Sequence, residues 1–188
     1  EHLTLLHDIK VVIAHDEECH LLQNVDGTVK IQVVKELECN HEEADTRLFL
    51  HCQYAAASLP SASSSTPAII IKCPDTDVFV IGIAKAHQIQ AQLLFHTGRG
   101  NNKHTLNLTA TQNQLGDSVA FALIGLHCFT GCDSTSYFCG RSKKKALKLM
   151  IESVDFQAAF QQFGATFSVE DGLLHTVEKF VCRLYDQD

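Results

Sequence analysis

The sequence has no long apolar run and no leader-like beginning. No stretch approaches the roughly 18 consecutive apolar residues that a membrane-spanning helix needs, and no basic segment followed by an apolar one opens the chain. We therefore expect a soluble protein without a membrane partner. With 188 residues, of which 45% are hydrophobic, the chain is long enough for one domain with a substantial core.

The sequence also lacks several motifs that mark known chemistries. It contains no P-loop, no GxSxG motif and no internal repeat, and its eight cysteines form no CxxC pairs. This pattern favours reduced thiols in an intracellular compartment, nuclear or cytoplasmic. One stretch is rich in cysteine and histidine and could be read as a set of zinc ligands, although its spacing matches no common zinc-binding motif. The alternative is that these cysteines are small buried hydrophobic side chains. That stretch contains His127, Cys128, Cys132 and Cys139.

Positive charge is scarce overall but concentrated in one place. The net charge of −7 argues against a protein that coats nucleic acid non-specifically. An acidic pocket beside a basic block is nevertheless what a metal-assisted enzyme acting on a polyanion needs. Solvated charge on an exposed helix face is the alternative. The basic block consists of Arg141, Lys143, Lys144, Lys145 and Lys148.

The most informative stretch runs from Ala68 to Ile83. Its aliphatic run favours the inner strand of an α/β sheet, and Cys73-Pro74 predicts the end of that strand. Asp75 and Asp77 follow, at the strand end where open α/β sheets bind ligands. Two carboxylates there favour Mg²⁺ or Mn²⁺. The alternative is that Asp75 caps the next segment and Asp77 is merely solvated.

A second acidic pair lies at the predicted start of a helix. The pattern predicts a helix beginning near His41, with Asn40 as N-cap and Glu43 in the capping-box position. Capping is therefore the alternative to a ligand role for Glu43. Asp45 lies in the first turn, where the helix dipole tolerates clustered acids.

A third carboxylate, Asp133, follows a long predicted helix. That helix begins at residue 110, carries an apolar face and ends at Gly131. Asp133 then stands at an element boundary, with an ordinary capping role as the alternative. Downstream, Ser142 is predicted to cap a basic helix over residues 143–151. A shorter helix is expected between residues 155 and 164.

The outer segments complete the predicted elements. Residues 9–14 and 30–34 read as two strands of a peripheral hairpin joined through an Asp-Gly turn. Residues 92–96 and 104–108 read as two strands around a glycine-containing turn. The last helix opens near residues 168–171, and its predicted core-facing stripe is Leu174, Val177, Val181 and Leu184.

Three fragments of this pattern together resemble a known family. Glu43-Ala44-Asp45 at a helix start, Asp75-Thr76-Asp77 after a strand, and Gly131-Cys132-Asp133 before a lysine-bearing helix resemble the flap-endonuclease branch of the PIN-like 5′-nucleases. The chain is also similar to uncharacterised, multi-copy animal proteins of mobile-element origin with the same HEEADTR, PDTDV and FTGCDST blocks. The resemblance covers residues 37–150.

The resemblance implies a three-layer α/β/α PIN-like (Rossmann-like) sheet with a C-terminal helical segment. It implies a single nuclease domain over residues 1–188, with a peripheral hairpin at 1–36, an acidic core at 37–133 and a helical, basic segment at 134–188. Relatives draw further aspartates from strands ahead of the Glu-x-Asp helix. Because the first forty residues offer no convincing equivalents, we expect either a missing N-terminal part or an incomplete site.

The resemblance also implies a nuclease that hydrolyses phosphodiester bonds of DNA or RNA with two Mg²⁺ or Mn²⁺ ions. The implied catalytic and metal-binding residues are Glu43 and Asp45 for one ion, Asp75 and Asp77 to bridge the ions or hold the second, and Asp133 to complete the second site. The implied phosphate contacts are Arg141, Lys143, Lys144 and Lys145. Two alternatives remain: a catalytically inactive nucleic-acid-binding or interaction domain of the same fold, and a GT-A-like glycosyltransferase that uses Asp75-Thr76-Asp77 as its DxD.

Overall fold

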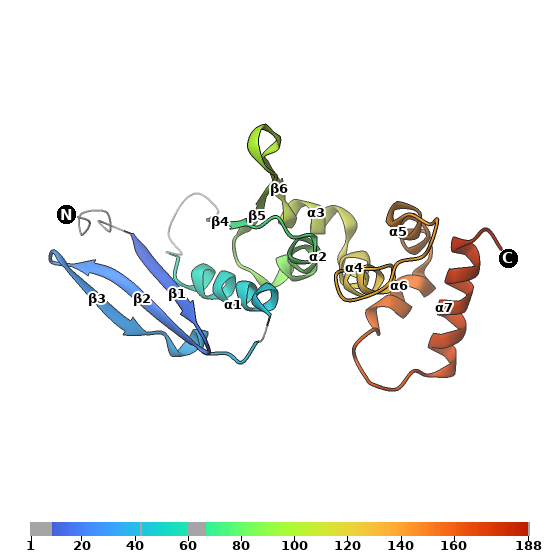
Figure 1. Cartoon of the computed structure of the whole chain (residues 1–188), viewed down its shortest axis with the longest axis horizontal. Coiled ribbons are helices and arrows are strands. Elements are labelled where there is room, and N and C mark those ends of the chain that lie inside the picture. The colour runs from blue at the N-terminus through green and yellow to red at the C-terminus, as the bar shows by residue number, and fades with distance from the viewer. Residues whose placement is uncertain (1–8, 42, 60–66, 188) are drawn as a thin grey trace. The chain divides into compact units, whose positions relative to one another are not determined.

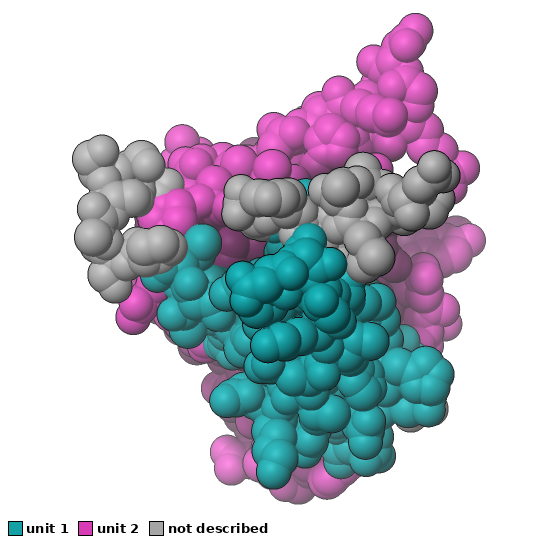
Figure 2. All heavy atoms as spheres, turned by 90° about the vertical axis from the view of Figure 1, so that its left-hand side faces the viewer, with its two compact units in different colours: residues 1–63 teal, residues 64–188 magenta. Residues whose placement is uncertain are grey.

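The computed structural model describes residues 9–41, 43–59 and 67–187. Within these residues the chain is a mixed α/β protein with seven α-helices and two three-stranded sheets (Figure 1). It divides into two compact units, residues 1–63 and residues 64–188, which are coloured separately in Figure 2. Each unit contains one of the two sheets, and each is described by itself below.

The sheet of unit 1 is an antiparallel meander in the order β1-β2-β3. Its strands are β1 (Lys10–His15), β2 (Glu18–Val25) and β3 (Thr28–Val33). The predicted two-stranded hairpin is therefore wrong, because β2 lies between the two strands that were expected. The Asp-Gly turn is confirmed: Asp26 and Gly27 have φ angles of 54° and 80°, as a tight turn between twisted antiparallel strands requires.

Helix α1 (Ala44–Ala57) follows a 3₁₀ turn, η2 (Lys35–Leu37). The predicted start near His41 is wrong, because Glu43 occupies the N-cap position and its side chain makes no capping bond. Arg47 connects α1 to the turn between β1 and β2, because its guanidinium group donates hydrogen bonds to the backbone carbonyls of Asp16 and Glu18. The unit has a small core of its own, formed by Cys19, Leu21, Val34 and Leu37 with Val12, Leu50 and Tyr54 packed against it.

The sheet of unit 2 has the order β4-β5-β6, with β4 parallel to β5 and β5 antiparallel to β6. Strand β4 (Ala68–Lys72) ends before Pro74, as predicted, but lies at an edge among the described strands. The prediction of an inner strand is therefore wrong. Ile70 is 64% exposed and only Ile71 is buried. The central strand is β5 (Gln92–Thr97), and it buries Leu93 and Phe95.

Helix α2 (Thr76–Lys85) follows β4 in the sequence and is followed by a 3₁₀ turn, η3 (Ala86–Gln88), and then by β5. A second 3₁₀ turn, η4 (Gly100–Asn102), connects β5 to β6 (His104–Asn107), and helix α3 (Leu108–Leu115) comes directly after β6. The predicted single helix from residue 110 is wrong. Gly116, with a φ of 75°, ends α3 and precedes α4 (Asp117–Phe129). A positive φ is the conformation in which glycine costs least, so the break occurs where the sequence allows it.

Three further helices complete unit 2: α5 (Lys143–Ile151), α6 (Val154–Gln161) and α7 (Asp171–Leu184). The predicted cap of α5 is confirmed, since the Ser142 hydroxyl accepts the Lys145 N–H at 3.2 Å. The predicted stripe of α7 is confirmed only in part. Leu184 is buried, but Leu174 is 50% exposed, and Phe180 is the other fully buried residue of the helix.

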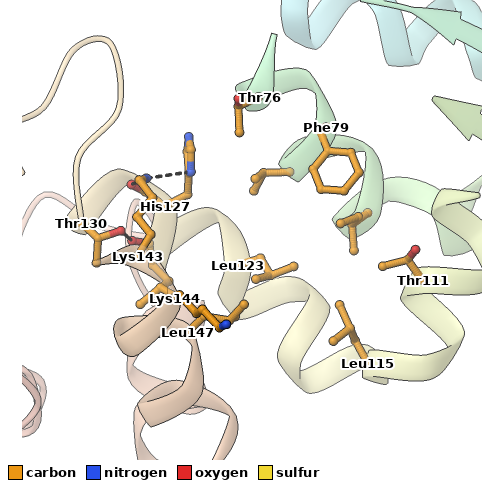
Figure 3. A pocket seen from close by; sticks show the side chains of 13 residues that line it. Thr76, Phe79, Thr111, Leu115, Leu123, His127, Thr130, Lys143, Lys144 and Leu147 are labelled. Atoms are coloured by element: carbon orange, nitrogen blue, oxygen red, sulfur yellow. Dashed lines mark hydrogen bonds between the residues drawn. The ribbon is translucent and has the colours of Figure 1, made fainter. Parts of the chain in front are cut away.

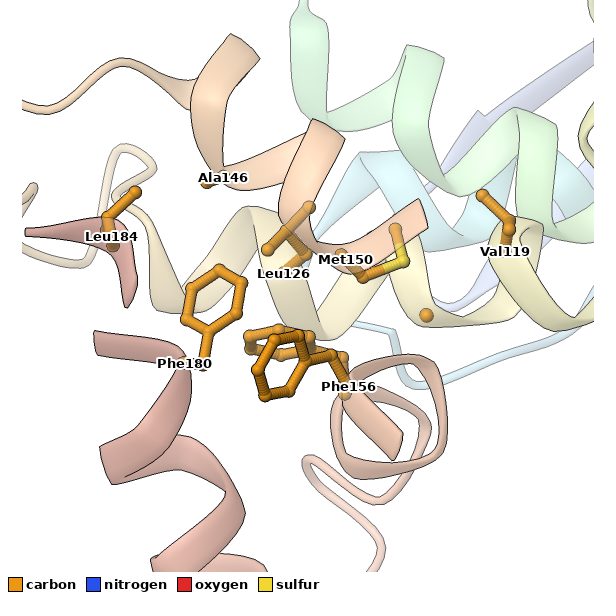
Figure 4. Packing of buried hydrophobic residues seen from close by; sticks show 9 residues of the cluster. Val119, Leu126, Ala146, Met150, Phe156, Phe180 and Leu184 are labelled. Carbon is orange, nitrogen blue, oxygen red and sulfur yellow. The ribbon is translucent and has the colours of Figure 1, made fainter. Parts of the chain in front are cut away.

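A core of aliphatic and aromatic side chains holds α4, α5, α6 and α7 together (Figure 4). The Phe180 ring meets Phe156 and Phe160 nearly edge-on, with ring centroids 5.2 Å and 4.8 Å away. The buried members are Val119, Ala122, Leu126, Ala146, Met150, Phe156, Phe160, Phe180 and Leu184. This packing fixes the basic helix α5 against α4.

At Gly125 the backbones of α4 and α6 approach each other closely. A Cβ at this position would collide with the carbonyl oxygen of Phe160. We expect Gly125→Ala to lower the free energy of unfolding by about 1–3 kcal/mol, because neither backbone can yield without disturbing the core. Urea unfolding followed by circular dichroism measures the change. The matched control is Gly172→Ala in α7, where the added methyl meets nothing within 4 Å. If both variants unfold at the same urea concentration, the close packing is not as described.

Candidate functional site

The two aspartates of the central motif have different local roles. Asp75 is the N-cap of α2, and its Oδ1 accepts the backbone N–H of Asp77 at 2.8 Å. The capping alternative is therefore correct for Asp75. Asp77 is not merely solvated: its Oδ1 accepts a hydrogen bond from His127 Nε2 at 2.8 Å. The His127 side chain is 12% exposed and that of Asp77 31%, so this pair is partly shielded from bulk water.

His127 links Asp77 to the basic helix. Because Nε2 donates to a carboxylate, Nδ1 is the acceptor of the neutral ring, and Lys143 Nζ donates to it at 2.9 Å. Lys143 Nζ also donates to the backbone carbonyl of His127 at 3.1 Å. The three side chains come from α2, α4 and α5, and together they are called the Asp77–His127–Lys143 chain. Figure 3 shows the His127 and Lys143 side chains.

Partial desolvation shifts the pKa of Lys143. Desolvation lowers the pKa of its ammonium group, and the negative charges of Cys132, Asp77 and Cys128 partly offset that effect. The charges of one carboxylate and two thiols thus act on the ammonium group at the head of α5. The apolar core that packs α5 against α4 fixes the position of Lys143.

The turn that carries Asp133 starts at Gly131, whose φ is 106°. A Cβ on Gly131 would lie 2.8 Å from the Cβ of Tyr137, so the position has no room for a side chain. The Thr135 hydroxyl closes the turn, accepting the Cys132 N–H at 3.0 Å and donating to the Cys128 carbonyl at 2.6 Å. Asp133 is exposed in this turn and caps no helix, since α5 begins only at Lys143.

The charge of Asp77 influences Cys128, at the end of α4, and Cys132, in the turn. Hydrogen bonds with the Ser134 hydroxyl, and next with the Thr135 hydroxyl, lower the pKa of the Cys132 thiol to about 7, while the Asp77 charge opposes them. Partial desolvation, and the charges of Cys132 and Asp77, raise the pKa of the Cys128 thiol. The Asp77 charge therefore opposes the ionisation of both thiols.

The predicted metal ligands come together only in part. Glu43 and Asp45 belong to unit 1, at the start of α1, whereas Asp75, Asp77 and Asp133 belong to unit 2. The carboxylate oxygens suit a hard divalent cation in kind. In the described part of the chain, however, no group of three or more His, Cys, Asp or Glu side chains is placed to hold a metal ion.

The crowded cysteine stretch is not a set of buried hydrophobic side chains. Cys128 and Cys139 are exposed and Cys132 is half-buried, so that alternative is wrong for these positions. All eight cysteines are free thiols.

The predicted phosphate contacts differ in their availability. Arg141 and Lys145 form ion pairs with Asp186, at 3.2 Å and 2.6 Å. Lys143 is engaged with His127. Lys144 is exposed and has no ion-pair partner among the described residues.

An apolar pocket of about 440 Å³ opens beside His127 and Lys143 of the Asp77–His127–Lys143 chain (Figure 3). Its walls come from α2, α3, α4 and α5, and include Phe79, Leu123 and Leu147. His127 and Lys143 lie at its border, together with Lys144. A volume of this size lies within the range of small-molecule sites.

Sequence reasoning did not identify His127 as the partner of Asp77. The two residues are 50 positions apart, and no local pattern connects them. The only available signal was the position of His127 in the last turn of a predicted apolar helix, near the Gly-Cys-Asp fragment. Thr135, which closes the turn, carried no signal beyond its place in a run of hydroxyl residues.

Comparisons of the chain with family models, curated proteins and solved structures found no match. Among the described helices, none has the length and apolar character needed to cross a membrane.

Two substitutions of Asp75 distinguish its capping role from a role that needs its charge. We expect Asp75→Ala to lower the free energy of unfolding by about 1 kcal/mol, because α2 loses its capping acceptor. Asp75→Asn keeps an acceptor oxygen and should stay close to the parent protein, although it removes the charge. Urea unfolding of both variants measures the difference. Equal destabilisation by alanine and asparagine would contradict a capping role.

Proposed function

We propose that the chain is a divalent-metal-dependent nuclease of the PIN-like type that hydrolyses phosphodiester bonds of DNA or RNA. One observation carries the proposal. In unit 2 the Asp77 carboxylate is linked through His127 to the first residue of the basic helix α5. Acids that suit a hard cation and lysines that suit phosphate are the two components of a metal-assisted phosphodiesterase.

The topology of unit 2 supports the same proposal. The parallel pair β4 and β5 is joined through α2, and the Asp75-Thr76-Asp77 motif follows directly on the carboxyl end of β4. Ligand sites of open α/β sheets lie at this end of the strands. We extend the proposal to the three-layer α/β/α arrangement that the resemblance implies.

In this proposal Asp75, Asp77 and Asp133 would hold a Mg²⁺ or Mn²⁺ ion, and Glu43 and Asp45 keep the ligand role that the resemblance gives them. A bound cation would polarise the phosphate and lower the pKa of a coordinated water. Asp77 Oδ1 accepts from His127, which leaves Oδ2 for a further partner. His127 therefore acts as a positioning residue that fixes the orientation of this carboxylate.

Lys143 and Lys144 are the residues that we assign to the phosphate. An ammonium group has three N–H donors, and Lys143 uses two of them on His127 Nδ1 and on the His127 carbonyl. One donor is left for a phosphate oxygen. Lys144 is exposed beside it. Contacts of this kind hold the nucleic acid backbone without reading its sequence.

A second candidate is a nucleic-acid-binding domain of the same fold without turnover. It is favoured by the engagement of the acids, since one oxygen of Asp75 caps α2 and one oxygen of Asp77 binds His127. The described residues also hold no group of three metal-ligating side chains. The basic helix would bind phosphates in either case.

Metal titration tests the proposal first. We expect Mn²⁺ or Mg²⁺ to raise the melting temperature of the protein saturably and to support cleavage of labelled single-stranded, duplex or flapped DNA, or of RNA. Asp77→Asn should abolish both effects, because it removes a charged ligand while it keeps an acceptor for His127. The exposed Glu178→Gln variant, with the same loss of charge on α7, is the matched control.

The outcomes separate the two candidates. Stabilisation with cleavage that Asp77→Asn removes supports the nuclease. Nucleic acid binding without metal-dependent stabilisation or cleavage contradicts the nuclease and supports the binding domain. If Asp77→Asn and Glu178→Gln both behave as the parent protein does, Asp77 is not a metal ligand.

The phosphate assignment gives a separate prediction. We expect Lys144→Gln to weaken nucleic acid binding and to reduce the slope of log K against log salt by about one, because one phosphate contact is lost. Lys179→Gln, an exposed lysine of α7, changes the net charge equally and is the control. Fluorescence anisotropy at several salt concentrations measures both. Equal effects of the two substitutions would mean that only net charge matters.

A further inference from the structure

The apolar surface of the pocket in unit 2 has no role in the proposed nuclease. The pocket lies between α2, α3, α4 and α5, and its lining is almost entirely apolar. In Figure 3, Lys143 and Lys144 of α5 lie on one side of it, and Phe79 of α2 and Thr111 of α3 lie on the opposite side. The aliphatic residues between them are Val80, Ile83, Leu115, Leu123, Leu126 and Leu147.

Several polar groups at the pocket already have partners within the protein. The Thr111 hydroxyl donates to the backbone carbonyl of Asn107 at 2.8 Å. The Thr130 hydroxyl donates to the backbone carbonyl of Leu126 at 2.7 Å. Both ring nitrogens of His127 are also engaged. A sugar or a nucleobase would find few partners here for its polar groups, and burying them unpaired is costly, so the enclosed part of a ligand must be hydrocarbon.

The ammonium groups at the border are different. Lys143 donates to His127 Nδ1 and to the His127 carbonyl, which leaves its third N–H for a ligand. Lys144 is exposed and forms no ion pair within the described part of the chain. Asp77, on the other side of His127, compensates only one of these two positive charges. The polar end of a ligand that enters this pocket should therefore be an anion.

The dimensions of the pocket favour a small molecule over a protein partner. The lining consists of 13 residues, whereas a stable protein interface engages about 20–30 residues on each side. The lining contains one phenyl ring, that of Phe79, and its other apolar residues are aliphatic. Aromatic stacking thus contributes little, and a flexible alkyl chain can follow the walls.

We propose that this pocket binds an alkyl carboxylate, with the hydrocarbon chain in the apolar cavity and the carboxylate against Lys143 and Lys144. The carboxylate accepts charge-assisted hydrogen bonds from the two ammonium groups. The alkyl chain displaces water from the apolar walls, which include Phe79, Leu123 and Leu147. The inference does not depend on the proposed nuclease activity, and its test contains neither a metal ion nor nucleic acid.

Isothermal titration calorimetry of the whole chain with hexanoate, octanoate and decanoate tests the proposal, at concentrations below those at which these salts form micelles. We expect one molecule to bind per chain, and the dissociation constant to fall about fourfold for each added methylene group until the cavity is full. Octanol has the same chain as octanoate without the charge, and should bind about tenfold more weakly or worse. No binding, binding at many sites per chain, or equal affinity for octanol and octanoate would overturn the proposal.

A substitution that fills the cavity locates the site. Val80→Phe should weaken decanoate binding about fifteenfold, as if two methylene groups no longer fitted. The matched control is Val154→Phe in α6, where the valine is 76% exposed and does not line the pocket; it should bind decanoate as the parent protein does. Circular dichroism verifies that both variants are folded. Equal affinities of the two variants would show that decanoate binds elsewhere.

A second substitution tests the carboxylate contact without changing the cavity. Lys144→Gln should weaken octanoate binding several-fold and leave octanol binding unchanged, because only the charged ligand loses a partner. Lys179→Gln, in α7 and outside the pocket, should change neither. If Lys144→Gln weakens both ligands equally, or if both lysine variants bind octanoate equally well, the carboxylate does not contact Lys144 and the proposal is wrong.

Discussion

The hydrogen bond from His127 to Asp77 joins segments of unit 2 that are far apart in the sequence. It links the start of α2 to the last turn of α4, and Lys143 continues the link to the start of α5. Each partner depends on the others: Asp77 selects the ring tautomer, and the ring then offers its second nitrogen to the ammonium group. The negative and positive ends of this chain compensate each other in a partly dehydrated place, where an unpaired charge would be costly.

The aromatic and aliphatic core under α4, α5, α6 and α7 makes this arrangement possible. Phe156 and Phe160 on α6 pack against Phe180 on α7, and Ala146 and Met150 of α5 are buried in the same cluster as Leu126 of α4. Without that packing the first turn of α5 would have no fixed position relative to α4, and Lys143 would be an ordinary surface lysine. The geometry of the polar residues is therefore a consequence of the apolar packing.

Local patterns in the sequence predicted the local parts of this structure. The cap at Ser142, the end of β4 before Pro74 and the Asp-Gly turn follow from propensities of a few neighbouring residues. The edge position of β4 could not be predicted, because an apolar run without alternation looks the same in an inner and in an edge strand. The break at Gly116 was also hidden, since the apolar spacing continues through it from α3 into α4.

The candidate site divides in the same way. The sequence identified Asp75 and Asp77 at a strand end, and a capping role for Asp75 was one of the alternatives that it left open. The link from Asp77 to His127 spans 50 positions and arises only from tertiary packing, so no spacing rule could reveal it. The acids at Glu43 and Asp45 lie in the other compact unit, and their role stays a prediction.

Gly131 gives the Gly-Cys-Asp fragment a second meaning. Its left-handed φ and its contact with Tyr137 exclude every side chain, whatever chemistry the neighbouring residues perform. Selection for a folded turn alone would keep this glycine in a descendant that had lost all activity. Persistence of the fragment in diverged copies of the gene would therefore trace the inheritance of a backbone shape, and only the residues around it could trace the inheritance of a function.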